Sequence, residues 1–341
     1  MNATDPTLAG RALRVAVLSA AHVHAASYVR LLESRADTEV ILADPDGFGD
    51  VPAERTVATI DEAWTAFDGE APDAVVVCSE NAGHKALVLE AARRGIHGLC
   101  EKPLATTVAD AAAMVAACAN ASVVLMTAFP VHFSPQVAAL RQTVDNGSLG
   151  EIIALAGANN GKLPTGRDWF TDPEAAGGGA LVDHVVHIAE ILDSLFGEPE
   201  SVHAVANGVL YGHTNDGDAE TGGLVTLRYA NGLIATIDCS WSQPAEAPTW
   251  GGLKLHVAGT GGQLDIDAFS QRVDGPGQWH PFGLNLDALL LEAFLEAVRS
   301  GEAQEPSGAV GARTVRVVNA AQESVCTGGR CHCADAAVAW R

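Results

Sequence analysis

Short apolar runs alternate with helical patterns through the first third of the chain, and this alternation constrains the fold more than any other feature. The runs lie at 14–18, 39–43, 73–78, 97–100 and 123–127. Stretches with the 3.6-residue apolar period of a helix separate them. Because the runs are apolar on both faces, they are typical of a parallel sheet that helices cover on both sides. The pattern predicts an α/β domain over residues 1–128.

The pattern changes after residue 128. Helical stretches are expected at 135–146, 180–196, 286–299 and 311–326. Strand-like runs follow one another at 201–210, 222–230, 233–241, 252–258 and 263–267. Consecutive strands without intervening helices indicate an antiparallel sheet. We therefore expect an α/β protein whose second domain, residues 129–341, is α+β with an open, mainly antiparallel sheet.

The charge balance excludes several kinds of partner. The chain has 20 basic and 42 acidic residues, a net charge of -22. This charge repels nucleic acid phosphates and anionic membrane surfaces, so we expect neither as a partner. The first residues do not resemble a signal peptide, and no apolar run approaches the length of a membrane span. We expect a cytoplasmic protein.

The cysteines also favour a reducing compartment. There are seven, an odd number, and Cys78, Cys100, Cys118 and Cys239 each fall singly inside an apolar run. Near the C-terminus, Cys331, His332 and Cys333 are ligand types for zinc. Three adjacent ligands cannot easily surround one tetrahedral ion, so an exposed tail is the favoured interpretation.

The turn after the first apolar run lacks the glycines of the usual dinucleotide motif. Ser19, Ala21 and His24 stand at the positions of the three glycines of G-x-G-x-x-G. The extra methyl of Ala21 is small, and the N-terminus of the following helix still offers N–H groups to an anion. Asp44 closes the second run, where a carboxylate can accept hydrogen bonds from both ribose hydroxyls of NAD and would repel the 2′-phosphate of NADP. The alternative is that Asp44 only initiates an Asp-Pro turn.

His22 and His24 form an H-x-H pair in the same turn. One interpretation is a metal or anion site beside a cofactor. The other is that His22 contacts phosphate while His24 packs under the sheet. Residues two apart on a helix do not share a face, so we expect no metal here or elsewhere in the chain.

Lys102 lies between Glu101 and Pro103 at the end of an apolar run. Lysine is scarce, with four residues against sixteen arginines. An amine can give up its proton, which arginine cannot do at ordinary pH, so a lysine kept here suggests acid–base chemistry. A surface lysine in a turn is the alternative.

A second informative stretch begins with three glycines, 177–179, ahead of a helix. They let the backbone come close to a ligand or to another chain segment. Asp183 and His187 are four residues apart and so share a helix face, where the carboxylate can orient the imidazole as a general base. Alternatively, Asp183, His187, Glu190 and Ser194 form the solvent-exposed stripe of an amphipathic helix.

These two stretches together resemble the glucose-fructose oxidoreductase, inositol dehydrogenase and rhizopine-catabolism (Gfo/Idh/MocA) family. The resemblance rests on Glu101-Lys102-Pro103 with the preceding residues 91–100, and on the glycines 177–179 with Asp183 and His187. It extends from residue 14 to about residue 322. It implies an N-terminal Rossmann domain and a C-terminal domain whose open sheet often packs in dimers or tetramers, so we expect a homodimer or homotetramer.

The resemblance also implies NAD(P)-dependent oxidation of a hydroxyl on a sugar, cyclitol or related polyol, or the reverse reduction. In that chemistry Lys102 bonds the reacting oxygen, Asp183 contacts the substrate and orients the pair, and His187 accepts the proton. We expect NAD, in preference to NADP, to be contacted by Ser19, Ala21, His22, Asp44, Ser79, Asn81, His84 and Glu101. We expect the substrate to be contacted by His132, Lys162, Arg167, Trp169 and His184, although an ordinary surface loop would equally explain several of these.

Two other functions remain open at this point. One is transient oxidation by a retained NAD within a glycosidase, lyase or epimerase cycle. The other is a sugar or nucleotide sensor without turnover, which the altered phosphate turn suggests. A sensor does not need side chains that act as a catalytic acid and base, so Lys102 and the Asp183–His187 pair favour an enzyme.

Overall fold

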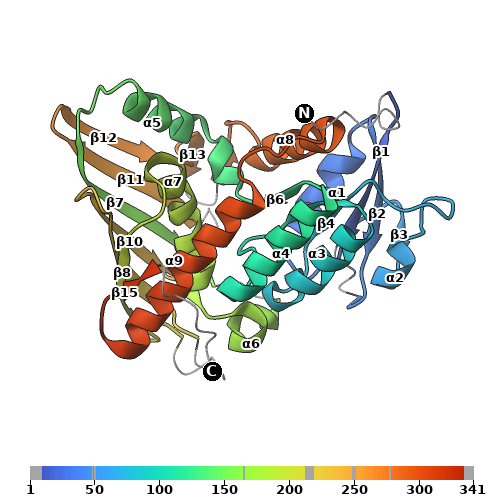
Figure 1. Ribbon diagram of the computed structural model, residues 1–341, viewed down its shortest axis with the longest axis horizontal. Helices are drawn as coiled ribbons and strands as arrows, with labels where there is room; N and C mark the ends of the chain where they lie inside the picture. The colour runs from blue at the N-terminus through green and yellow to red at the C-terminus, as the bar shows by residue number, and fades with distance from the viewer. Residues whose placement is uncertain are drawn as a thin grey trace. The chain divides into compact units, whose positions relative to one another are not determined.

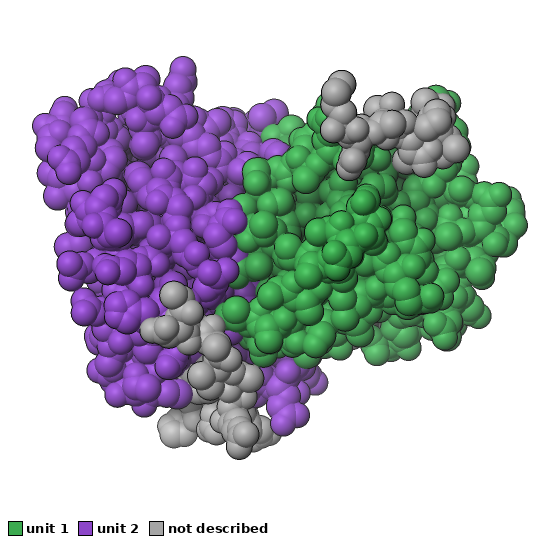
Figure 2. All heavy atoms as spheres, in the orientation of Figure 1, with its two compact units in different colours: residues 1–129, 286–312 green, residues 130–285, 313–341 purple. Residues whose placement is uncertain are grey.

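The computed structural model describes residues 10–47, 49, 51–163, 166–211, 219–247, 251–275 and 278–333. The chain forms two compact units, coloured separately in Figure 2. The first comprises residues 1–129 and 286–312, and the second comprises residues 130–285 and 313–341. These compact units differ from the expected domains in the segment 286–312. As functional domains, the ranges 1–128 and 129–341 stay a prediction.

The first unit is built on a six-stranded parallel sheet in the order β3-β2-β1-β4-β5-β6 (Figure 1). From β1 the chain runs outward through β2 to β3 and then returns to β4 on the other side of β1, so the strand order reverses between β1 and β4. Ligands of such sheets bind beyond the carboxyl ends of the strands at this reversal. The strands are β1 (Leu13–Leu18), β2 (Thr38–Ala43), β3 (Thr56–Val57), β4 (Ala74–Val77), β5 (His97–Cys100) and β6 (Leu125–Thr127).

The helices of this unit pack in pairs, α1 beside α8 and α3 beside α4. Thr107 begins α4 because its hydroxyl accepts a hydrogen bond from the backbone N–H of Asp110. The strands between the helices are almost entirely buried, as the apolar runs predict. The helices are α1 (Ala25–Glu33), α2 (Ile60–Ala63), α3 (His84–Arg93), α4 (Val108–Ala121) and α8 (Leu286–Ser300).

Residues 286–312 belong to the first unit because they attach to β6. The backbone N–H of Thr127 donates to the carbonyl of Pro306 at 2.9 Å, and Ser307 forms a bridge to Met126. Gly308 packs directly on Leu125, where a Cβ would come within 2.7 Å of its side chain. The segment thus covers the edge of the sheet, a contact that no local sequence pattern indicates.

The second unit contains a seven-stranded sheet in the order β12-β11-β7-β10-β9-β8-β15. Strands β7 and β10 pair in parallel, and every other neighbouring pair is antiparallel. The mainly antiparallel sheet that we predict is therefore confirmed. The strands are β7 (Ile152–Gly161), β8 (Ser201–Asn207), β9 (Gly222–Arg228), β10 (Ile234–Ser240), β11 (Gly251–Gly259), β12 (Gly262–Asp267) and β15 (Cys331–His332), and a separate hairpin joins β13 (Arg272–Gly275) to β14 (Gln278–Pro281).

One helix packs closely on this sheet. Gly157 of β7 leaves room for Ile188 of α7, since a Cβ would lie 2.8 Å from its Cδ1 atom. A π-helical segment, Leu181–Val185, leads directly into α7. The helices of this unit are α5 (Pro135–Asp145), α6 (Pro173–Ala176), α7 (Val186–Phe196) and the later part of α9 (Gly308–Thr327), which begins in the first unit.

The C-terminal segment corrects one expectation. Cys331 and Cys333 do not lie in an exposed tail, because β15 pairs with β8 and only 9% and 2% of these residues are exposed. All seven cysteines are free, and the four in apolar runs are buried as expected.

Within the described residues, one segment has the length and composition of a membrane-crossing helix. It is Pro173–Phe196, with a mean hydropathy of 1.2. However, 72% of its most apolar window is buried inside the protein, as in the core helix of a globular fold.

Candidate active site

The turn between β1 and α1 adopts the backbone shape of a glycine turn without glycine. Ser19 has a φ of 72°, in the left-handed region that glycine favours. This conformation costs a non-glycine residue about 1 kcal/mol or more. Two hydrogen bonds offset the cost: the Ser19 N–H donates to the carbonyl of Ala43 at 2.7 Å, and its hydroxyl accepts from the N–H of Ala21 at 3.1 Å. The serine therefore replaces the first glycine of the motif.

His22 fastens this turn to the neighbouring strand. Its backbone N–H donates to the carbonyl of Cys78, directly after β4, at 2.8 Å. Only 2% of His22 is exposed, and burial lowers the pKa of its imidazole to about 3. His22 is therefore neutral at physiological pH. The turn lies at the reversal of strand order, where a dinucleotide pyrophosphate is expected.

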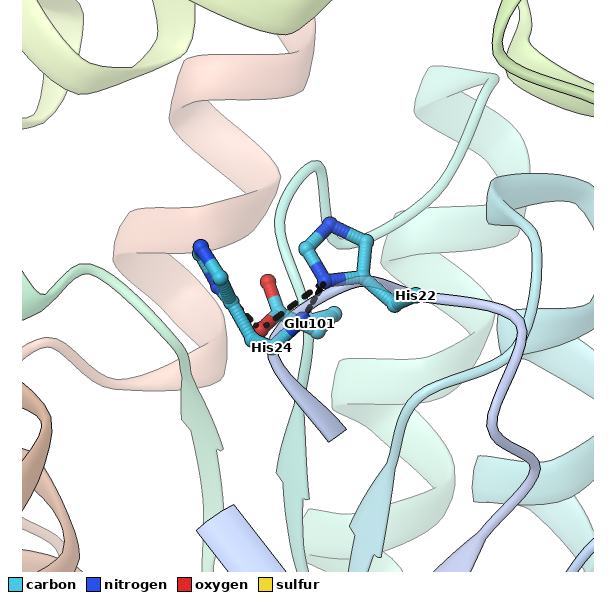
Figure 3. A group of neighbouring side chains, drawn as sticks. All are labelled: His22, His24 and Glu101. Carbon is cyan, nitrogen blue, oxygen red and sulfur yellow. Dashed lines mark hydrogen bonds and ion pairs between the residues drawn. The ribbon is translucent and has the colours of Figure 1, made fainter. Parts of the chain in front are cut away.

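Glu101 lies under the turn in a group of ionisable side chains (Figure 3). It is fully buried, and its Oε1 lies 2.9 Å from Nδ1 of His24. The hydroxyl of Tyr28 donates to the same oxygen at 2.8 Å, and the backbone N–H of Lys102 donates to Oε2 at 3.0 Å. The carboxylate thus holds both the turn and the Glu101-Lys102-Pro103 loop in position.

The electrostatics of this group favour an ion pair. Burial acts to raise the pKa of Glu101, but His22 and His24 outweigh it and hold that pKa well below its ordinary value. Burial acts to lower the pKa of His24, yet the adjacent carboxylate raises it overall. Glu101 is therefore ionised, and His24 gains its proton more readily than a free histidine.

Lys102 is buried at the end of β5, with 6% of the residue exposed. The loop that carries it is supported by His84, which is fully buried. His84 Nδ1 lies 2.9 Å from the carbonyl of Pro103, and its Nε2 lies 3.3 Å from the carbonyl of Ser79. Burial lowers the pKa of His84, so the ring is neutral and carries one proton, which the shorter contact assigns to Nδ1. His84 thus donates a hydrogen bond to the loop that carries Lys102 and packs beside the carbonyl of Ser79.

Asp44 follows β2 directly, as predicted. One carboxylate oxygen, Oδ2, accepts the N–H of Gly49 at 3.2 Å, which is the turn role of this residue. The other, Oδ1, is buried and has no hydrogen-bond partner among the described parts of the chain. A buried acceptor without a partner costs free energy unless a ligand satisfies it. Hydroxyls such as those of a dinucleotide ribose would satisfy this oxygen, and their contact with Asp44 stays a prediction.

In the second unit, Gly177 ends α6 in the left-handed conformation, with a φ of 81°, and the other two glycines pack against other chain segments. A Cβ on Gly179 would lie 2.0 Å from the backbone oxygen of Glu220, and a Cβ on Gly178 would lie 2.6 Å from Nε2 of Gln322. The carboxylate of Glu220 accepts the N–H groups of Gly179 and Leu181 at 3.0 and 2.9 Å. Of the two explanations that the sequence leaves open, close approach of chain segments accounts for Gly178 and Gly179.

Asp183 and His187 lie on and just after the π-helical segment. Asp183 Oδ2 accepts a hydrogen bond from Nε1 of Trp241 at 3.0 Å and lies 3.6 Å from Nε2 of His184. The backbone carbonyl of His184 accepts from the side chain of Asn159 at 3.0 Å. π-Helical turns are frequent at functional sites. The pairing of Asp183 with His187 stays a prediction.

The alternative of a solvent-exposed stripe is wrong at Glu190. Only 1% of this residue is exposed, and its Oε1 lies 2.6 Å from Nδ1 of His132. Arg141 donates to the backbone carbonyl of His132 at 2.9 Å. His132, a candidate for substrate contact, is therefore engaged in a network that joins α5 to α7.

The remaining substrate candidates lie in and around the segment after β7. Lys162 Nζ donates to the carbonyl of Ala245 at 2.9 Å. Arg167 precedes a short 3₁₀ helix, Asp168–Thr171. Trp169, on that helix, stacks on Phe170 with ring centroids 3.9 Å apart. Their part in substrate binding stays a prediction.

Three neighbours of the candidate site were not identified in the sequence analysis: Tyr28, Glu220 and Trp241. Tyr28 lies four residues after His24, so helical spacing could have placed it on the same side of α1. Glu220 and Trp241 are brought to the glycine turn and to Asp183 only by the sheet, and local spacing carries no signal for them.

A dinucleotide-binding Rossmann unit joined to a unit with a large, mainly antiparallel sheet defines the class of this protein: a two-part oxidoreductase fold. The family model for the oxidoreductase family with an NAD-binding Rossmann fold matches residues 15–129, and that for the GFO/IDH/MocA C-terminal domain matches residues 137–265. The chain belongs to the Gfo/Idh/MocA family, which confirms the resemblance seen in the sequence.

Its relatives act on varied carbohydrate derivatives. The chain is 30% identical to a 1,5-anhydro-D-fructose reductase of Ensifer adhaerens over 73% of its length and 70% of the relative's. It is 27% identical to a myo-inositol 2-dehydrogenase of Thermotoga maritima, over 74% and 77% of the two chains. It is also 27% identical to a 2,7-anhydro-N-acetylneuraminate hydratase of Escherichia coli, over 68% of this chain and only 62% of the relative.

Solved structures agree in fold. GenD2 from gentamicin A biosynthesis, in complex with NAD, superposes with a TM-score of 0.81 at 23% identity, covering 94% of this chain and 96% of that one. A levoglucosan dehydrogenase, in complex with NADH and levoglucosan, gives a TM-score of 0.78 at 20% identity, over 94% and 99% of the two chains. At these identities the likeness establishes the fold alone.

Proposed function

We propose that this protein is an NAD-dependent oxidoreductase that oxidises a hydroxyl of a sugar, cyclitol or related polyol, or catalyses the reverse reduction. The observation that carries the proposal is Lys102, a buried amine at the carboxyl end of β5 in a dinucleotide-binding unit. A lysine is rarely buried unless its amine has a task or a partner there. Relatives that act on myo-inositol and 1,5-anhydro-D-fructose support the substrate class.

The proposed roles follow the chemistry of alcohol oxidation. Bound NAD supplies the hydride acceptor. The Lys102 amine hydrogen-bonds the reacting oxygen and stabilises the charge that develops on it as the O–H proton leaves. His187 takes that proton, and Asp183, held by the indole N–H of Trp241, orients the substrate. In the reverse direction His187 returns the proton to the same oxygen.

Cofactor binding is assigned to the edge of the first sheet. Ser19, Ala21 and His22 shape the turn for the pyrophosphate, and Asp44 receives the ribose hydroxyls. Ser79 and Asn81, at the end of β4, line the nicotinamide side. The fully buried Glu101 and His84 act through the loops that they hold. A carboxylate at position 44 favours NAD over NADP because it repels a 2′-phosphate.

A second candidate is an NAD-mediated lyase, glycosidase or epimerase cycle in which the cofactor stays bound. The hydratase among the relatives favours it. The two candidates differ in cofactor release. A dehydrogenase forms one NADH per substrate oxidised, whereas the retained-cofactor enzyme forms product without net NADH and carries NAD through purification.

The test begins with a screen of sugars and cyclitols by NADH absorbance, together with chromatography of small molecules released from the denatured protein. On any active substrate, Lys102→Ala is expected to lower kcat by about 10²- to 10⁴-fold while NADH affinity changes little. Lys85→Ala is the matched control, because Lys85 is a half-exposed lysine paired with Asp110 on α4. Unchanged turnover in Lys102→Ala would rule out the assigned role.

A further inference from the structure

The phosphate turn carries a cluster that the proposed redox chemistry does not use. Two imidazole nitrogens and one carboxylate oxygen, from His22, His24 and Glu101, all lie within 4.8 Å of one another. We name these residues the His-His-Glu cluster. We propose that the His-His-Glu cluster binds a first-row divalent transition-metal cation of the Zn²⁺ type.

The spacing of the ligand atoms suits such an ion. Zn²⁺ binds imidazole nitrogen and carboxylate oxygen at roughly 2.0 to 2.2 Å, which places tetrahedral ligand atoms about 3.3 to 3.5 Å apart. Glu101 Oε1 lies 3.5 Å from Nδ1 of His22 and 2.9 Å from Nδ1 of His24. The contact at His24 is shorter than the tetrahedral spacing, so His24 must move to admit the ion, and its side chain, 34% of which is exposed, is the one with room to do so.

The backbone makes the convergence possible. His22 lies in the turn after β1, and His24 is the residue before the first turn of α1, so the rule that i and i+2 diverge on a helix does not apply. The two rings meet edge to face with centroids 4.7 Å apart. Figure 3 shows both rings directed toward the Glu101 carboxylate, which approaches from the loop after β5. A sequence-adjacent pair and one distant acid thus form a three-ligand site.

The protein also orients the ligands. Tyr28 donates to Glu101 Oε1 and the backbone of Lys102 donates to Oε2, so the carboxylate is fixed by hydrogen bonds of the kind that surround metal ligands. The backbone N–H of His24 lies 3.3 Å from Nδ1 of His22, and the cation would replace this long hydrogen bond at that nitrogen.

The ligand types indicate the metal. Imidazole with carboxylate and no thiolate suits Zn²⁺, Co²⁺, Ni²⁺ or Cu²⁺, and it suits Mg²⁺ and Ca²⁺ poorly because those ions prefer oxygen ligands. Three protein ligands leave a fourth position for water or for an oxygen of a bound molecule. A cation here would join the phosphate turn to the loop that carries Lys102.

The test titrates ZnCl₂ into the 341-residue chain after chelator treatment and removal of the chelator. Calorimetry is expected to give one equivalent of saturable binding. His24→Gln and His22→Gln are each expected to weaken it by at least about tenfold. His256→Gln is the matched control, since His256 forms an exposed pair with Asp265 at 2.7 Å in the other unit, and its binding is expected to match the unmodified protein.

CoCl₂ provides a spectroscopic readout of the same site. Four-coordinate Co²⁺ is expected to give intense visible absorption that His24→Gln abolishes. Three results would overturn the proposal: no saturable Zn²⁺ binding, equal binding in His24→Gln, or loss of binding in His256→Gln. A weak six-coordinate Co²⁺ spectrum would overturn the tetrahedral site. These measurements need neither substrate nor NAD, so they stand apart from the proposed function.

Discussion

At the scale of single residues, we propose that Asp44 determines the preference of the first unit for NAD over NADP. Its buried Oδ1 has no partner among the described residues, and its charge opposes a 2′-phosphate. Asp44→Asn is expected to weaken NADH binding by about tenfold, because roughly one charge-assisted hydrogen bond is lost. The ratio of NADH affinity to NADPH affinity is expected to decrease as well. Fluorescence titration with each reduced dinucleotide measures both affinities.

The neighbouring exposed acid supplies the control for this prediction. Asp46→Asn removes the same charge two residues away. It is expected to leave the ratio of NADH to NADPH affinity within twofold of the unmodified protein, because an exposed charge is largely screened. An unchanged ratio in Asp44→Asn would show that Asp44 only shapes its turn.

The positions of individual residues in the fold were easier to predict from the sequence than the contacts that those residues make. Asp44 and Lys102 lie at strand ends as their positions in the sequence predict, because a strand end follows from the apolar run before it. The left-handed Ser19 was not predicted, since the motif suggested that a glycine was needed there. The sequence also gave no indication that Glu101 would meet both histidines, because the three residues come together only when β1 and β5 enter one sheet.

At the scale of elements, the stability of the glycine segment that precedes the π-helical turn depends on close packing at Gly179. A Cβ at position 179 would lie 2.0 Å from backbone oxygen, which cannot move aside as a flexible side chain can. Gly179→Ala is therefore expected to lower the free energy of unfolding by about 1 to 3 kcal/mol or more. Thermal and urea unfolding measure it.

Gly252→Ala is the matched control for this packing prediction. Gly252 also belongs to the second unit, and a Cβ there would meet no atom of the described residues within 4 Å. We expect its unfolding midpoint to stay close to that of the unmodified protein. Equal midpoints in the two variants would contradict the packing role of Gly179.

The buried Glu220 makes the stability of the same turn depend on pH. Burial raises the pKa of this carboxyl above its ordinary value of 4.5. Its contribution to the free energy of unfolding is thus fully present below about pH 4.5 and is lost as pH rises through the folded-state pKa. Glu220→Gln keeps an oxygen for the N–H groups of Gly179 and Leu181 but removes the titration.

The expected result is a stability difference, Glu220→Gln minus unmodified protein, that increases with pH above about 4.5. Unfolding midpoints between pH 4 and pH 8 measure it. Glu246→Gln, an exposed change in the same unit, is expected to show no such trend. A difference that falls with rising pH would contradict the sign of the shift.

The long elements were predictable, and the short ones were not. Helix α4 and strand β4 carry clear periodic or continuous apolar signals. Strand β15 has two residues and no period, and it forms because β8 offers an open edge for pairing. Strand β7 continues to Gly161 through Asn159 and Asn160, although asparagine and glycine disfavour strands, because β10 and β11 hydrogen-bond to it from both sides. Tertiary pairing outweighs local propensity there.

At the scale of the whole molecule, exposed apolar side chains on the face of the second sheet away from α7 lead us to predict self-association. Val205 and Leu224 are direct partners in the β8–β9 register and are 56% and 49% exposed, while Ile234 on β10 is 49% exposed. Exposed β-branched and leucine side chains along a sheet are typical of a protein interface. The net charge of -22 opposes association, so apolar burial must outweigh charge repulsion in the homodimer or homotetramer that we propose.

Leu224→Glu tests this by placing a charge on that face. Burying an unpaired carboxylate in an interface would cost more free energy than the apolar contact of Leu224 contributes. Light scattering coupled to size exclusion is expected to give an oligomeric mass for the unmodified protein and the mass of one chain for the variant. Phe282→Glu, a change at a residue that is 68% exposed outside the seven-stranded sheet, is expected to leave the oligomer intact. If Phe282→Glu dissociates the oligomer and Leu224→Glu does not, the subunit contact lies outside this face. If the unmodified protein already has the mass of one chain, the exposed face does not mediate self-association.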